Sequence, residues 1–222
     1  MLTSAAVCPH PPLLLPQIAG GAAPELDGLR AACAEALRRL SGDLVVVVGS
    51  GPLTRDFGRD AAGSLRPYGP DLTVGSGDPV LPLSLTIGRW LLGERSALYR
   101  AVADDAPVEA CARLGTELAG LAGRVALLVM GDGSACRTER APGYLDERAE
   151  GFDARVARAL AEADPCALAG LDATVAAELR AAGRAPWQVL AGAARGGRFT
   201  GELLADEAPY GVGYLVASWV RP

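Results

Sequence analysis

The side chains with the clearest potential for chemistry stand at three places in this 222-residue sequence. His10 is the one histidine of the chain, Ser50 lies between two glycines, and Asp132 and Ser134 belong to a Gly-Asp-Gly-Ser segment. Imidazole and carboxylate groups transfer protons or ligate metals, and hydroxyl and backbone N–H groups in glycine-rich loops bind anions. We therefore take His10, Asp132 and Ser134 as candidate catalytic groups.

Each candidate also has an interpretation that involves no chemistry. His10 could ligate a metal with Cys8, because residues two apart on an extended segment face the same side, or it could be a hydrogen-bonded histidine at a strand end. Asp132 and Ser134 could cradle an anion, or they could satisfy the backbone of an ordinary turn, and Ser50 has the same two interpretations. A serine nucleophile needs an adjacent base, and no G-x-S-x-G motif is present, which disfavours a serine hydrolase.

The pattern of short β-branched runs and longer helical stretches predicts a single α/β domain over residues 1–222, with three α/β/α layers and a largely parallel or mixed central sheet. The predicted strands are 2–8, 43–48, 124–130 and 212–220, with one further short strand at 72–74 in an otherwise long loop over 54–80. Helices are predicted to begin near 24, 83, 107 and 185, with a mostly helical stretch over 146–183 that is broken at 164–165. In the helix near 107, we expect Asp105 to cap the first turn.

In such sheets, ligands bind outside the carboxyl ends of the strands. We therefore expect the segments that carry His10, Ser50 and Asp132 to converge there and form a pocket. Apart from the candidate catalytic groups, the predicted pocket residues are Ser50, Gly51, Gly131, Gly133, Tyr144 and Tyr210. Packing explains the two tyrosines equally well.

The charge composition argues against two classes of binding partner. The chain has 26 acidic and 21 basic residues, a net charge of −5, and every basic residue is an arginine. Nucleic acids and anionic membrane surfaces select basic faces, so we expect neither as a partner. Five cysteines without a C-x-x-C pair, together with an amino-terminal segment interrupted by prolines, indicate a cytoplasmic protein rather than a secreted one.

Three motifs follow one another along the chain: CPHPP at 8–12, DLVVVV at 43–48 and MGDGS at 130–134. In order and spacing they resemble the LigB-type family, which comprises the catalytic subunit of class III extradiol ring-cleaving dioxygenases and the related MEMO-like proteins. The strings APGYLDER at 141–148, APWQVL at 185–190 and APYGVGY at 208–214 are similar to a divergent, actinobacterial-looking branch of that family.

The resemblance implies a non-haem Fe(II) held by two histidines and a carboxylate, with a further histidine as the acid–base group. His10 stands at the position of the first iron ligand. The other two histidines would follow Val48 and Met130, where this chain has Gly-Ser-Gly-Pro and Gly-Asp-Gly-Ser, and the carboxylate could be Asp206 or Glu207. One histidine cannot supply a site that needs two.

We therefore expect a LigB-like protein that has lost the standard Fe(II) site, needs no cofactor and binds a small anionic or aromatic molecule in the pocket around His10. One alternative is a metal-dependent oxidoreductase or hydrolase with a reduced site built from His10, Cys8 and carboxylates. Another is a MEMO-like protein that binds a partner protein. The sequence leaves open a homo-oligomer and a second subunit that supplies a missing ligand.

Overall fold

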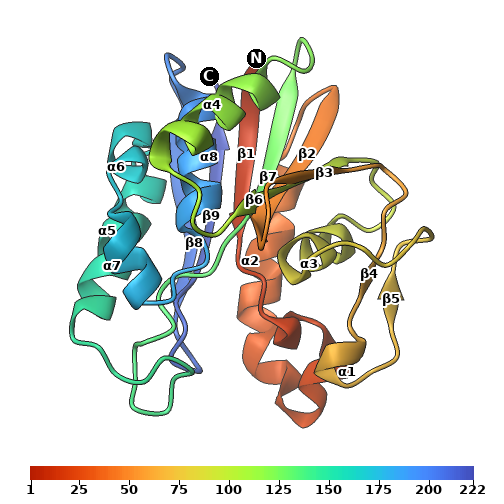
Figure 1. The fold of residues 1–222 in the computed structure, drawn as a ribbon, viewed down its shortest axis with the longest axis vertical. Coiled ribbons are helices and arrows are strands. Elements are labelled where there is room, and N and C mark those ends of the chain that lie inside the picture. The colour runs from red at the N-terminus through yellow and green to blue at the C-terminus, as the bar shows by residue number, and fades with distance from the viewer.

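The protein, described here by a computed structural model of residues 1–222, is built on a seven-stranded sheet with helices on both faces (Figure 1). The strands of this sheet are β1 (Leu2–Cys8), β2 (Leu44–Gly51), β3 (Arg55–Phe57), β6 (Leu98–Ala103), β7 (Val125–Met130), β8 (Thr200–Glu207) and β9 (Tyr214–Val220). Their order is β3-β6-β2-β7-β1-β9-β8. The central four strands are parallel and the flanking pairs antiparallel, which confirms the predicted α/β/α fold with a mixed sheet.

Strands β2 and β7 are buried on both faces because apolar side chains occupy nearly all of their positions. In β2, Val46 and Val48 point into one apolar layer, while Val45 and Val47 point into the other. This alternation is the period-two geometry of a strand. It explains why a continuous apolar run forms a central parallel strand.

Helices complete the two outer layers. One face carries α4 (Val108–Ala119), α5 (Arg148–Ala161), α6 (Pro165–Ala169), α7 (Ala173–Glu178) and α8 (Arg184–Ala194), and the other carries α1 (Pro16–Ala19), α2 (Asp27–Arg38) and α3 (Leu83–Leu92). In α2, Leu29, Cys33 and Ala36 are buried at steps of four and three, which places them on one helical stripe. None of the helices combines the length and apolarity needed to cross a membrane.

Four strands were missing from the prediction: the short β3 and β4 (Gly63–Ser64), and the longer β6 and β8. Strand β6 has Arg100 at its centre, where it pairs with Asp56 and Glu117, so its sequence does not show a continuous apolar run. Strand β8 is an edge strand with acidic residues along it, and it pairs only with β9. Its hydrophobic signal is weak because one edge and part of one face meet solvent.

Smaller differences concern segment ends. Residues 49–51, expected in a turn, continue β2 and pair with β6, so Ser50 lies on a strand. Helix α4 starts after Pro107 with no side-chain cap, so the cap expected from Asp105 is absent. The loop at 54–80 contains β3 and the hairpin of β4 (Gly63–Ser64) and β5 (Thr73–Val74).

Candidate functional site

The carboxyl ends of β1, β7, β2 and β6 lie side by side at one edge of the sheet, because these strands are parallel neighbours. His10 follows β1, Asp132 follows β7, Ser50 lies in the last residues of β2, and Asp104 follows β6. The structure therefore brings three of the predicted site residues to one edge and adds Asp104, which the sequence analysis missed.

His10 and Asp132 form a pair. The backbone N–H of His10 donates to Oδ1 of Asp132 at 2.7 Å, and His10 Nδ1 lies 3.6 Å from the same oxygen. His10 is 7% exposed, and its Nδ1 is buried without a hydrogen-bond partner. Burial raises the pKa of the Asp132 carboxyl, and the nearby charge and backbone N–H of His10 oppose that rise.

Asp104 lies beside Ser50 and within electrostatic reach of His10. Partial desolvation raises the pKa of Asp104, while the Ser50 hydroxyl and then the charges of His10 and Arg184 act in the opposite direction. Arg184, buried at the start of α8, donates to the backbone carbonyl oxygens of Asp104 and Ala106. These bonds fasten the segment after β6 to the helical layer and fix where Asp104 stands.

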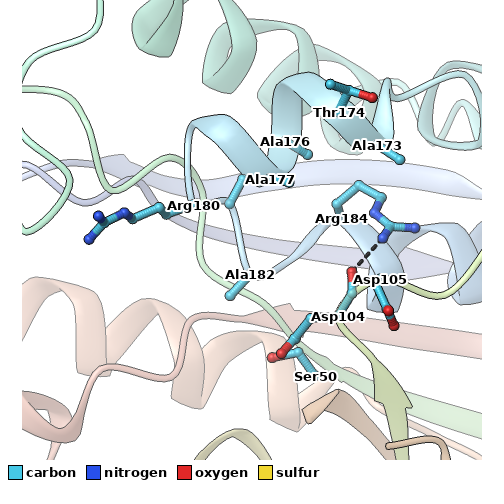
Figure 2. Close-up of a pocket in the computed structure, with 11 residues that line it drawn as sticks. Ser50, Asp104, Asp105, Ala173, Thr174, Ala176, Ala177, Arg180, Ala182 and Arg184 are labelled. Atoms are coloured by element: carbon cyan, nitrogen blue, oxygen red, sulfur yellow. Dashed lines mark hydrogen bonds between the residues drawn. The ribbon is translucent and has the colours of Figure 1, made fainter. Parts of the chain in front are cut away.

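A pocket of about 670 Å³ opens next to Ser50 and Asp104. One side of the pocket is polar and is lined by Ser50, Asp104, Asp105 and Arg184. The opposite wall consists of five alanines between residues 173 and 182, and Arg180 belongs to the same stretch of chain. Figure 2 shows the side chains of Ser50 and Asp104 directed toward one another, with the alanines of α7 facing them across the space. We call this space the Ser50–Asp104 pocket.

The loop after β7 does bind an anionic group, but the group is the protein's own Asp153. The N–H of Ser134 donates to Oδ1 of Asp153 at 2.7 Å, and Arg137 donates to Oδ2 at 3.2 Å. A Cβ on Gly133 would lie 2.6 Å from that Oδ1, so only glycine lets the carboxylate approach. Asp153 is 1% exposed, and burial raises its pKa despite these donors.

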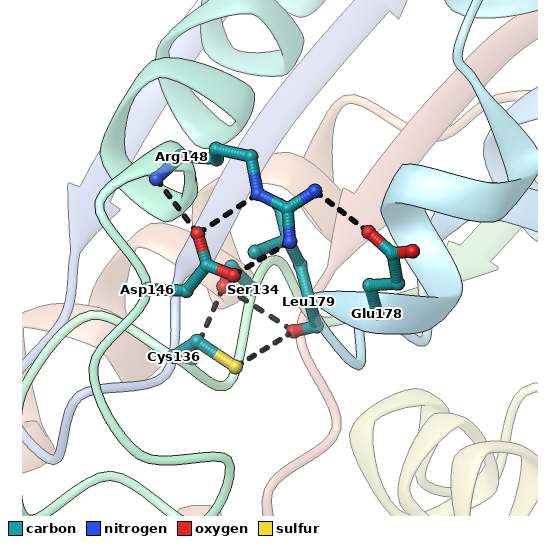
Figure 3. Close-up of polar contacts among 6 residues, drawn as sticks. All are labelled: Ser134, Cys136, Asp146, Arg148, Glu178 and Leu179. Carbon is teal, nitrogen blue, oxygen red and sulfur yellow. Dashed lines mark hydrogen bonds and ion pairs between the residues drawn. The ribbon is translucent and has the colours of Figure 1, made fainter.

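Ser134 is therefore a turn residue and not a member of the pocket. It is fully buried, its hydroxyl donates to the carbonyl of Leu179 at 3.3 Å, and it accepts from the N–H of Cys136 at 3.0 Å (Figure 3). These bonds occupy its polar atoms, which corrects the expectation that Ser134 contacts a ligand.

The predicted pocket glycines have packing roles instead. A Cβ on Gly131 would lie 2.5 Å from the Cα of Gly183 and 3.1 Å from the Trp187 indole nitrogen, so Gly131 allows the β7 loop to pack against α8. Gly51 is buried against Ala101 and Pro82. Neither glycine lines the Ser50–Asp104 pocket.

The two predicted tyrosines also lie away from this pocket. Tyr144 is 63% exposed, and the hydroxyl of Tyr210 donates to Glu25 Oε2 at 2.9 Å. A different tyrosine, Tyr214 of β9, lies close to Asp132. Burial raises the pKa of Tyr214, and the charge of Asp132 raises it further.

The predicted metal ligands do not assemble. Cys8 is fully buried beside Cys33, and that thiol together with burial raises the pKa of Cys8 well above its ordinary value. Asp206 lies near Asp153, and a Cβ on Gly28 of α2 would lie 3.8 Å from Glu207 Oε1. No group of three or more His, Cys, Asp or Glu side chains is arranged to hold a metal ion. The ligand set that the family resemblance implies is therefore not matched.

Among the residues that the sequence analysis missed, Asp104 and Asp105 have a recognisable signal and Arg184 does not. Asp104 and Asp105 follow the segment Leu98–Ala103, which alternates weakly and is bounded by Pro107, as expected of a strand followed by a helix. Arg184 begins a helix that is otherwise apolar apart from Gln188, and the burial of Arg184 arises from tertiary contacts that spacing does not reveal.

Comparisons with known proteins support the fold but give no information about the site. No model of a known protein family matches the sequence, and neither does any curated protein. Among solved structures, the chain is similar to an uncharacterised protein from Escherichia coli K12. The TM-score is 0.54 and the identity 13%, over 98% of this chain and 99% of that chain. A likeness at this identity shows a shared fold alone.

Proposed function

We propose that this chain binds a small organic molecule in the Ser50–Asp104 pocket and has lost the iron chemistry of the dioxygenases that its sequence resembles. The observation that carries the proposal is the position of the pocket. It opens at the carboxyl ends of parallel strands, where α/β proteins bind ligands, and its volume of about 670 Å³ suits a small molecule.

The two sides of the pocket favour a particular ligand chemistry. The alanines of one wall offer an apolar surface of small side chains, which suits a flat ring. Opposite it, the Asp104 carboxylate accepts hydrogen bonds, and the Ser50 hydroxyl can donate or accept them. A hydroxyl-bearing aromatic compound satisfies both sides. The carboxylates of Asp104 and Asp105 disfavour a ligand whose acidic group lies at this position.

Loss of the iron site is supported by the residues themselves. The ring-cleaving site needs two histidines and one carboxylate. His10 is the one histidine, and Cys8, Asp206 and Glu207 are directed elsewhere.

The His10–Asp132 pair favours a second candidate, an acid–base enzyme. Contrary to the sequence-based expectation, neither residue lines the Ser50–Asp104 pocket, but His10 lies within electrostatic reach of Asp104, which does. Histidine is the side chain that most often acts as an acid–base group in enzymes, and Oδ1 of Asp132 lies 3.6 Å from Nδ1 of His10. The experiment for this candidate is a turnover assay on any compound that binds, with His10→Asn as the inactive control.

Calorimetric titration of the protein with catechol tests the binding proposal. Asp104→Asn should weaken binding about tenfold, because a hydrogen bond to a charged group contributes about 1.5–3 kcal/mol and about 1.4 kcal/mol corresponds to a factor of ten. Asp71→Asn, which removes the same charge from an exposed loop, should bind like the wild type. Ala177→Leu adds volume to the alanine wall and should also weaken binding.

Two results would contradict the proposal. One is the absence of measurable heat from catechol in the wild-type protein and in the Asp71→Asn control. The other is binding that is equally strong in wild-type, Asp104→Asn and Ala177→Leu protein, which would place the ligand elsewhere. Stoichiometric Zn(II) binding that is lost in His10→Ala would revive the reduced metal site as the function.

A further inference from the structure

We infer that the chain has a second binding site, for the oxyanion group of a small molecule, in a pocket lined by Arg59, Arg89 and Arg95. This arginine pocket has a volume of about 530 Å³ and lies between the loop after β3, helix α3 and the turn that leads into β6. Tyr99 near the start of β6 lines it, whereas Asp104 follows the end of the same strand. The two pockets are therefore at opposite ends of β6.

Arg89 is held in place by contacts from several elements. Its Nη1 donates to the carbonyl oxygen of Arg59 at 2.7 Å and to the Tyr99 hydroxyl at 3.3 Å, and its guanidinium lies over the Tyr99 ring, 5.5 Å from the centroid. Gly75 has a φ of +105°, and a Cβ at that position would collide with Nε of Arg89. A left-handed glycine thus leaves the room that the arginine occupies.

The three arginines lack acidic partners. None of them forms an ion pair, although eleven such contacts occur elsewhere in the molecule. Asp60 and Glu94 line the same pocket, and they also remain unpaired. Three positive and two negative side chains leave the pocket with an excess of one positive charge.

The unused hydrogen-bond donors of these arginines suit one kind of ligand. Arg59 uses only Nη1, toward Ser96, and Arg89 uses only Nη1, so each keeps its Nε and Nη2 without a protein acceptor. Arg95 uses only Nη2, toward Leu40. The Nε–Nη2 edge of a guanidinium is the fork that binds the two oxygens of a carboxylate or phosphate. The geometry therefore matches a phosphate or carboxylate group.

Calorimetric titrations with inorganic phosphate and with malonate, each at low ionic strength, test this site on the full chain. Trp90 lines the pocket and is partly exposed, whereas the other two tryptophans are fully buried, so its fluorescence reports binding at this location. We expect binding of at least one probe, with a change in Trp90 emission. Phosphate binding alone would indicate a phosphorylated ligand, malonate binding alone a carboxylic acid, and both support the site.

Two variants and two controls localise the ligand. Arg59→Gln and Arg89→Gln should each weaken binding about tenfold, because each removes a charged hydrogen-bonding fork. Arg59 is exposed and donates only to Ser96, so its variant keeps the fold. Arg113→Gln is the control for net charge, since Arg113 is exposed on α4 and has no ion pair or hydrogen bond. Arg180→Gln is the control for the Ser50–Asp104 pocket.

The inference would be overturned by no binding of either probe up to about 10 mM, which corresponds to an interaction weaker than about 3 kcal/mol. It would also be overturned if Arg113→Gln weakened binding as much as Arg59→Gln, or if Arg180→Gln removed binding while Arg59→Gln and Arg89→Gln retained it. These results do not depend on the outcome of the catechol titration.

Discussion

Removal of the Asp153 carboxylate should destabilise the protein by far more than removal of a partly exposed carboxylate in the same region. Asp153 accepts from the buried N–H of Ser134 and from Arg137, and it is 1% exposed. In Asp153→Ala, the Ser134 N–H loses its acceptor, which costs about 1–3 kcal/mol. Arg137 is 22% exposed and can turn to solvent, so the loss of its ion pair with Asp153 adds little to the destabilisation.

The lost side-chain packing adds to that figure, and we expect a total of about 2–4 kcal/mol for Asp153→Ala, a large part of a typical stability of about 5–15 kcal/mol. Asp153→Asn should cost less, about 1 kcal/mol, since the amide oxygen still accepts from Ser134 and no charge is buried. The assay is urea denaturation followed by circular dichroism.

Asp146→Asn is the matched control. Asp146 is paired with Arg148 on the surface, and that pairing lowers its pKa to about 2, but both side chains meet solvent (Figure 3). Its variant should unfold at nearly the wild-type urea concentration. The reasoning would be refuted if Asp153→Ala and Asp146→Asn shifted the midpoint equally, or if Asp153→Asn were as destabilising as Asp153→Ala.

Burial and packing also determine how the protein should respond to a substitution at Gly183, to a thiol reagent and to pH. Gly183→Ala should destabilise the protein by about 1–3 kcal/mol in urea denaturation, because the new Cβ would overlap the Trp187 indole. Cys166 is exposed and the other four cysteines are buried, so a thiol reagent should modify one thiol in the native protein and all five in denaturant. Burial raises the folded-state pKa of Asp132 above 3.8, so the folded state holds this proton more tightly than the unfolded state. Stability should therefore fall as the pH rises from 3.8 through the raised value, and Asp132→Asn should flatten that part of the profile of urea midpoint against pH.

The strands that could be predicted from the sequence are those with a continuous or nearly continuous apolar run. The apolar runs of β2 and β7 are long enough to specify buried parallel strands, and Leu2–Cys8 was predicted with the observed bounds. Strand β6 was missed because Arg100 at its centre is stabilised by partners from β3 and α4, Asp56 and Glu117, which are distant in the sequence. Edge strand β8 gives a weak signal for a comparable reason, since its exposed positions are polar.

The candidate site was predictable only in part. The convergence of His10, Ser50 and Asp132 follows from parallel strand order, which chain connectivity favours. The separation of Ser134 from the pocket does not follow from the sequence, because it depends on Asp153 of α5 reaching the β7 loop. Asp104 could not be assigned to the site without β6, whose end it marks.

The central claim is that a small molecule occupies the Ser50–Asp104 pocket, and amide chemical-shift mapping with catechol on isotope-labelled protein tests it most directly. We expect the largest shifts at Ser50, Asp104 and Ala177, which line the pocket, with little change near Arg59 and Arg89. Shifts confined to other regions, or no shifts at concentrations that saturate the calorimetric signal, would contradict the claim.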